Sequence, residues 1–230
     1  MAIVAIAVAY FVLVPPGTPE PQPPPGSVVV LPFENMGQGE RSEALADGMT
    51  EPLINALGRV PGLRVTGRSS AFYWKGKGRD PSAIGRRLRV RTVLESSVQV
   101  SGDRIRVRSQ LFDAATGYVL WSRVFDRVLA DVFAVQDDIA RAIVGAVKTE
   151  GLDEHSVPYV RGGTADMEAY NLCLLGRYFW NKRSRADLDK AKAFFEQALV
   201  RDGGYAQAYA GLADVYLILG NNMLIEPREA

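Results

Sequence analysis

The sequence has 230 residues, of which 47% are hydrophobic and 23% are charged, and this composition is typical of a folded protein. The formal net charge of +1 excludes a strong overall field that would attract nucleic acid. One cysteine, Cys173, and one histidine, His155, exclude an intrachain disulfide and a cysteine- or histidine-rich metal centre. We therefore expect no catalytic residues, no metal and no cofactor, and we expect Cys173 to be a core residue.

The chain begins with an unbroken apolar run at residues 2–14. This run is shorter than the about 20 residues of a membrane-spanning helix and matches the length of a signal-peptide core. It has no preceding basic residue and no small-x-small cleavage site before Pro15. We interpret residues 1–14 as a hydrophobic anchor, the distal part of a transmembrane helix that starts upstream. A signal anchor and a buried helix are the alternatives.

A proline-rich linker follows at residues 15–26, where seven of twelve residues are proline. Proline cannot continue a helix and favours the extended polyproline II conformation. The linker would therefore act as a semi-rigid spacer that holds a globular module away from a bilayer.

An α/β domain is predicted over residues 27–150, with the order β-α-β-α-β-β-β-α. Parallel strands are expected first, followed by an antiparallel meander, which together make a mixed sheet. In the first helix, Pro52 is expected to restart the helix after Thr50. Asp80 is expected to cap the second helix. The predicted strands are 28–33, 63–66, 91–100, 104–113 and 118–126, and the predicted helices are 42–59, 81–88 and 129–148.

This domain resembles the TolB amino-terminal-domain-like module, which occurs in the C-terminal regions of bacterial adenylate cyclases, serine/threonine kinases and transmembrane transcriptional regulators. The resemblance rests on an Ala46-Asp47-Gly48 turn, on Asp113-Ala114-Ala115-Thr116-Gly117 and on Leu120-Trp121-Ser122. Ser96 departs from the glycine usual in that family. The resemblance implies a non-catalytic module that follows an effector domain and precedes tetratricopeptide repeats.

A linker at 151–165 leads to residues 166–230, where the spacing matches the tetratricopeptide pattern of paired helices. The second repeat is incomplete, so Leu212, Tyr216 and Leu219 are expected to lack part of their covering. The matching residues are Leu172, Leu175, Gly176 and Phe179 in the first helix, Ala191, Phe195 and Ala198 in the second, and Tyr209, Leu212, Ala213 and Tyr216 in the next.

Two groups of side chains are candidate partner-binding residues. The aromatic residues of the repeats could line a peptide-binding surface, although repeat core is the alternative. The arginines could form a basic face for a partner, for anionic lipid head groups or for nucleic acid, although a solvated outer sheet face is the favoured alternative. The two groups are Tyr170, Tyr178, Trp180 and Tyr209, and Arg104, Arg106 and Arg108.

These features predict a membrane-anchored, non-catalytic interaction or sensor module of a bacterial signalling protein. We expect a protein or peptide partner and membrane contact through residues 1–14, and no nucleic acid or small molecule as partner. We expect the inner membrane as location, with the soluble part in the periplasm. The alternative is a regulatory C-terminal fragment of an adenylate cyclase or serine/threonine kinase whose catalytic domain lies upstream.

Overall fold

The computed structural model describes residues 22–78, 80–147 and 163–225. The predicted anchor, His155, and most of the proline-rich linker and of the linker at 151–165 lie outside these residues. Within the described ranges, no helix has both the length and the apolar character needed to cross a membrane.

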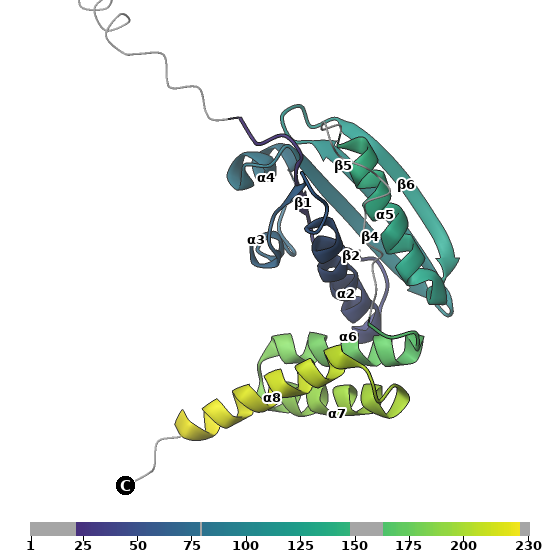
Figure 1. The fold of residues 1–230 in the computed structure, drawn as a ribbon, viewed down its shortest axis with the longest axis vertical. Helices are drawn as coiled ribbons and strands as arrows, with labels where there is room; N and C mark the ends of the chain where they lie inside the picture. The colour runs from purple at the N-terminus through teal and green to yellow at the C-terminus, as the bar shows by residue number, and fades with distance from the viewer. Residues whose placement is uncertain (1–21, 79, 148–162, 226–230) are drawn as a thin grey trace, which may run out of the picture.

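The α/β domain is built on one mixed sheet with the strand order β3-β1-β4-β5-β6, and β2 also pairs with β4 (Figure 1). Strand β1 runs parallel to β3 and β4, whereas β4, β5 and β6 form an antiparallel meander, as predicted. The strands are β1 (Ser27–Val30), β2 (Glu34–Asn35), β3 (Arg64–Val65), β4 (Thr92–Ser101), β5 (Arg104–Asp113) and β6 (Val119–Val128).

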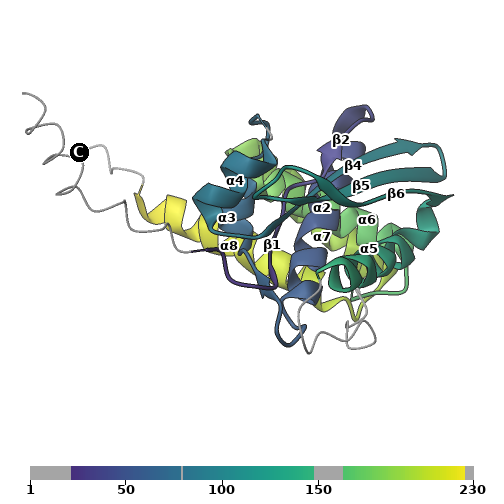
Figure 2. The same ribbon diagram turned by 90° about the horizontal axis from the view of Figure 1, so that it is seen from above.

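The two long helices of this domain lie together on one face of the sheet (Figures 1 and 2). They meet the inward side chains of the meander, such as Ile105 and Val107, while Arg104 and Arg106 alternate with these on the open face. Asp80 caps α4 by accepting a 3.0 Å hydrogen bond from the Ser82 amide, as predicted. The helices are α2 (Gly39–Leu57), α3 (Arg68–Phe72), α4 (Pro81–Leu88), the 3-10 turn η1 (Leu129–Asp131) and α5 (Val132–Ala146).

Helix α2 runs unbroken through Gly48 and Pro52, so the predicted turn at residues 46–48 and the predicted restart before Pro52 are wrong. An internal proline costs a helix about 3 kcal/mol. Burial of Leu53 and Leu57, both fully buried, stabilises the helix by about 1.5–3 kcal/mol each and offsets this cost. Side-chain bonds to the same turn contribute as well: Thr50 Oγ1 accepts from the Phe33 amide at 3.1 Å, and Gln136 Nε2 donates to the Met49 carbonyl at 2.9 Å.

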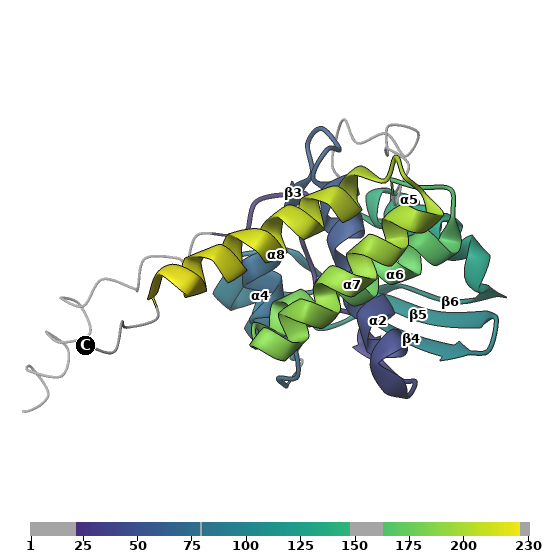
Figure 3. The same cartoon turned by 90° about the horizontal axis from the view of Figure 1, so that it is seen from below.

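An all-α region of three helices follows, α6 (Met167–Lys182), α7 (Arg185–Arg201) and α8 (Ala206–Ile225). Figure 3 shows the three helices packed side by side. Asp166 caps α6 by accepting bonds from the Glu168 and Ala169 amides at 2.9 Å, and Ser184 caps α7 by accepting from the Asp187 amide at 3.1 Å. Tyr216 on α8 is 53% exposed, whereas Leu212 and Leu219 are partly buried.

Candidate functional site

The α/β domain and the helical region are joined by direct packing of α2 against α6 (Figure 1). Gly48 makes this close approach possible, because a Cβ atom added there would overlap the Leu174 side chain. Tyr170 extends the contact, since it is only 2% exposed and belongs to the core of the α/β domain. Its ring lies edge-on against Phe133 of α5 with 4.6 Å between centroids. One apolar core therefore reaches from the sheet into the helical region.

Ion pairs surround this joint but contribute little to it. Arg41 approaches Glu168 at 3.4 Å, and Lys182 approaches Glu40 at the same distance. All four side chains are more than a third exposed, and pairs of this kind contribute about 0–1 kcal/mol. The apolar contacts of Tyr170 and Leu174 consequently dominate the stability of the joint.

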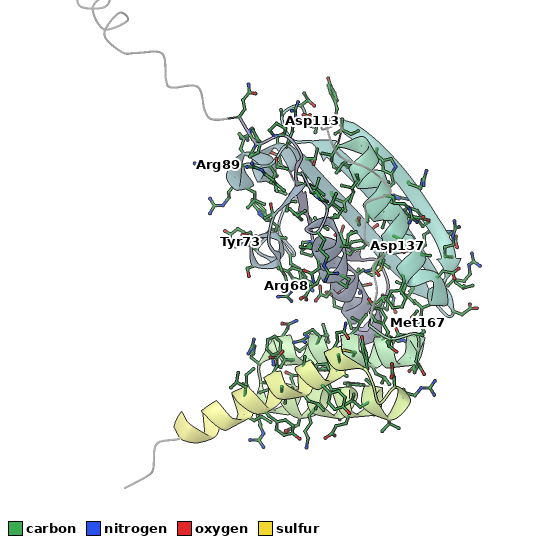
Figure 4. The ribbon with its side chains drawn as sticks, in the orientation of Figure 1. Arg68, Tyr73, Arg89, Asp113, Asp137 and Met167 are labelled. Atoms are coloured by element: carbon green, nitrogen blue, oxygen red, sulfur yellow. The ribbon has the colours of Figure 1, made fainter. Side chains whose placement is uncertain are left out.

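A cleft of about 250 Å³ opens at the rim of the joint. Three of its lining residues are arginines: Arg59 and Arg68 from the α/β domain, and Arg177 from α6. Figure 4 shows Arg68 on the side of the α/β domain that faces the helices. Two of these arginines have an acidic neighbour, since Arg68 Nε lies 3.1 Å from Glu51 and Arg177 lies 2.6 Å from Asp214. The cleft therefore combines three guanidinium groups with the carboxylates of Asp47 and Glu51 and with apolar side chains such as Leu174.

A second group of charges fixes the segment after α3 to α2. Lys75 Nζ lies 2.6 Å from Asp47 and 2.8 Å from Glu43. Burial raises the pKa of the Asp47 carboxyl above its ordinary value, although Lys75 acts in the opposite direction. Burial lowers the pKa of Lys75, but hydrogen bonds to Asp47 and Glu43 outweigh it, so the net shift is upward and Lys75 stays an ammonium. This network attaches the segment after α3 to α2 beside the cleft, which Asp47 lines.

Cys173 also lines the cleft and is buried, as predicted. Burial raises the pKa of its thiol, and a protonated thiol is a poor nucleophile and metal ligand. Burial likewise raises the pKa of Tyr170 and Tyr205, which line the same wall. These side chains can supply shape and hydrogen bonds to a ligand, and they are poorly suited to proton transfer near neutral pH.

The structure divides the predicted partner-binding residues among several places. Tyr170 is buried in the joint and Tyr178 lines the cleft. Trp180 is half-buried under the Arg183 guanidinium, 3.7 Å from the ring centroid, and Tyr209 is 55% exposed on α8. The three predicted arginines lie on the open face of the sheet: Arg104, Arg106 and Arg108.

Sequence reasoning missed the cleft arginines Arg59, Arg68 and Arg177, because they come from segments that are far apart in the chain. A weak signal was available at Gly48, since a glycine inside a helical pattern often marks a close packing contact. The sequence alone does not show which element makes that contact.

The described residues therefore define an α/β domain packed against an all-α region, with an arginine-lined cleft at their joint. No family model matches the chain. A protein of Rhizobium meliloti (strain 1021) named putative adenylate cyclase 3 is 38% identical over 200 residues. The match covers 86% of this chain and 34% of that protein, so the chain spans about a third of the relative.

Similar solved structures include TolB from Acinetobacter baumannii, with a TM-score of 0.42 at 13% identity. That match covers 54% of this chain and 29% of TolB. The LpoB C-terminal domain from Escherichia coli has a TM-score of 0.37 at 20% identity and covers 53% of this chain and 93% of that domain. Both likenesses are loose and extend over about half of the chain.

Proposed function

We propose that the chain is a non-catalytic interaction or sensor module of a bacterial signalling protein, which binds a protein or peptide partner. The observation that carries this proposal is the cleft at the α2–α6 joint, because a ligand there contacts both parts of the molecule. Binding would therefore stabilise the packed arrangement of the two parts relative to others. A sensor responds to its ligand through such a shift between conformations.

The dimensions of the cleft favour a peptide over a small metabolite. Pockets for drug-sized ligands have volumes of about 300–1,000 Å³ and are mostly apolar. The cleft has about 250 Å³ and is lined by three arginines and by the carboxylates of Glu51 and Asp47, which are paired with Arg68 and Lys75. This volume and lining suit one or two side chains of a peptide that include a carboxylate. Tyr178 would supply an aromatic surface beside them.

The helical region is proposed to be one tetratricopeptide repeat followed by the first helix of the next. Support comes from Phe195 of α7, which occupies the space left by Gly176 of α6 and Gly211 of α8. Such close packing of small and large residues joins neighbouring helices in this repeat class. Arrays of this kind commonly use their exposed helix faces for binding.

A second proposal is that the chain is the regulatory part of an adenylate cyclase, with the catalytic domain in the same polypeptide. It is favoured by the 38% identity to the Rhizobium meliloti protein, of which the chain spans about a third. The two proposals differ in whether an open reading frame for a catalytic domain continues upstream of Met1. Sequencing of the locus distinguishes them.

We further propose that residues 1–14 tether the module to the inner membrane and that its soluble part lies in the periplasm. Protease treatment of spheroplasts tests the orientation. The soluble part should be degraded in intact spheroplasts, and protection until lysis would contradict a periplasmic location.

Site-directed photocrosslinking tests the partner-binding proposal. A benzophenone amino acid replaces Tyr178 in the cleft, and the control carries it at Val200, which is 87% exposed on α7. Position 178 should give a discrete crosslinked product in membranes and position 200 should not. Equal labelling at both positions would show that the cleft is not a specific site.

A further inference from the structure

Strand β6 forms one edge of the sheet. It is last in the strand order, and among the described residues it pairs with β5 alone. Figures 1 and 2 show it at the outer side of the sheet, beside α5. The backbone N–H and C=O groups on the outer side of this ten-residue strand are therefore available to another strand.

Exposed apolar side chains gather on the same strand and at Tyr118, the residue directly before it. Eleven large apolar side chains are exposed in the described residues, and five of them lie within residues 118–128. Soluble proteins usually protect an edge strand with lysine, proline or a covering element, and β6 contains neither lysine nor proline. A long apolar edge of this kind marks a pairing surface. The five are Tyr118 (76%), Val119 (48%), Leu120 (48%), Val124 (52%) and Val128 (40%).

A groove of about 500 Å³ runs between β6 and α5. Leu120, Trp121 and Arg123 line its strand side. Its helix side is lined by the small residues Ala142, Gly145 and Ala146, which leave room for incoming side chains, and by Arg141 and Asp138, which are paired with each other at 2.8 Å. An edge strand beside a helix-walled groove can bind an extended peptide, because the edge supplies backbone hydrogen bonds and the groove accepts alternate side chains.

The charge around β6 indicates which kind of strand would pair with it: a second copy of β6 or a strand from another protein. Strands β5 and β6 together carry five arginines and two aspartates. One of these aspartates, Asp126, is already paired with Arg104 and Arg106. A second copy of β6 would bring two cationic strands together, and like charges on neighbouring strands destabilise pairing. An acidic strand is favoured for the same reason.

We propose that β6 binds an extended protein segment of alternating aliphatic and acidic residues as an added strand. The acidic side chains of the added strand enter the groove beside α5, where they meet Arg123. Its aliphatic side chains lie on the other face of the sheet, against the exposed Val124 and Val128. This surface is separate from the α2–α6 cleft, so the proposal holds whether or not the cleft binds a partner.

Binding of a defined peptide to the full chain tests this proposal. The probe is a fluorescent nine-residue peptide of alternating valine and glutamate, and its binding is followed by fluorescence anisotropy. Saturable binding that weakens with added salt is expected. R123E should lower the affinity at least tenfold, whereas R185E, an identical charge change at a 71% exposed position on α7, should alter it less than twofold.

Two further measurements separate strand addition from simple charge attraction. A peptide of the same sequence with every second amide N-methylated should bind at least tenfold more weakly, because it lacks backbone donors on one side. Hydrogen exchange of β6 amides should slow when the unmodified peptide binds. Equal affinity of the methylated peptide, unchanged exchange in β6, or absence of binding would overturn the proposal. A concentration-dependent dimer that protects β6 without peptide would also overturn it.

Discussion

Phe195 is the residue on which the packing of the three C-terminal helices depends. It is fully buried, and its ring occupies the space beside Gly176 and Gly211 on the two flanking helices. The repeat pattern identified Phe195 and Gly176 from sequence. It did not identify Gly211, because the consensus position for a small residue falls two residues later, at Ala213, which is exposed. The contact between Gly211 and Phe195 arises from the packing of α8 against α7, which the repeat pattern did not specify.

Replacement of Gly211 by alanine should destabilise the protein. The added Cβ overlaps the Phe195 ring, and overpacking of a core costs about 1–3 kcal/mol. The higher helix propensity of alanine offsets about 1 kcal/mol of this loss in the free energy of unfolding. Urea unfolding measures the difference. G220A is the matched control, because no atom lies within 4 Å of a Cβ placed there, and it should be neutral or stabilising. Equal stability of G211A and G220A would contradict the packing argument.

Ser96 stands where the module that the domain resembles usually has glycine, and its hydroxyl has a partner across the sheet. The hydroxyls of Ser96 and Ser109 lie directly opposite each other on β4 and β5, 2.8 Å apart and buried. Each hydroxyl therefore serves as the hydrogen-bond partner of the other in a buried part of the sheet.

Removal of one of these hydroxyls should cost more than removal of both. S96A leaves the Ser109 hydroxyl buried without its partner, which costs about 1–3 kcal/mol. S96A/S109A leaves no unpaired group and should be clearly more stable than either single variant. A double-mutant cycle from urea unfolding gives the coupling energy. Additive losses in the double variant would show that the two hydroxyls do not depend on each other.

At the scale of elements, strong periodic patterns were predicted well and short or interrupted elements were not. The alternation of apolar and polar residues gave β5 its bounds, because one face is buried and one is open. The two-residue strand β2 was predicted as loop, since Glu34 and Asn35 have no strand pattern and pair only because β4 lies beside them. Helix α3 was likewise missed, because it has only five residues.

The hairpin of β5 and β6 should lose stability at low pH. Hydrogen bonds from Arg106 and Arg104 lower the pKa of the Asp126 carboxyl in the folded protein. The stabilisation is therefore full above the ordinary pKa of about 3.9, and it is lost as the pH falls through the lowered folded value. D126N lacks this contribution, so its deficit in unfolding free energy should be constant between pH 5 and 7 and disappear toward pH 2.

The arginine partners provide the control for this pH dependence. R104Q/R106Q keeps Asp126 but removes the two groups that lower its pKa. This variant should show the same loss of pH dependence as D126N. A deficit for D126N that is as large at pH 2 as at pH 7 would instead indicate a packing effect of the substitution.

At the scale of the whole molecule, the sequence predicted two modules in the right order, and their joint could not be predicted. Gly48, Phe133 and Tyr170 come from three elements that are distant in the chain, and each fits an ordinary pattern of its own helix. The sequence therefore predicts Tyr170 as a binding residue as readily as a core residue. Its burial against Phe133 reassigns it to the joint, at the wall of the cleft that Tyr178 also lines.

Because one core reaches across the joint, the two parts should unfold together, and Y170A should separate them. Truncation of a buried aromatic side chain costs about 3–5 kcal/mol, and here the loss falls on the contact between the parts. Variants that retain only Trp121 report on the sheet, and variants that retain only Trp180 report on α6. In the parent protein both fluorescence signals should give one urea transition, whereas with Y170A the two midpoints should differ. Y209A removes a tyrosine that is 55% exposed and should leave the transitions coincident. Coincident midpoints in Y170A would mean that other contacts between α2 and α6 suffice to couple the two parts, and the role assigned to Tyr170 would then fall to Leu174 and its neighbours.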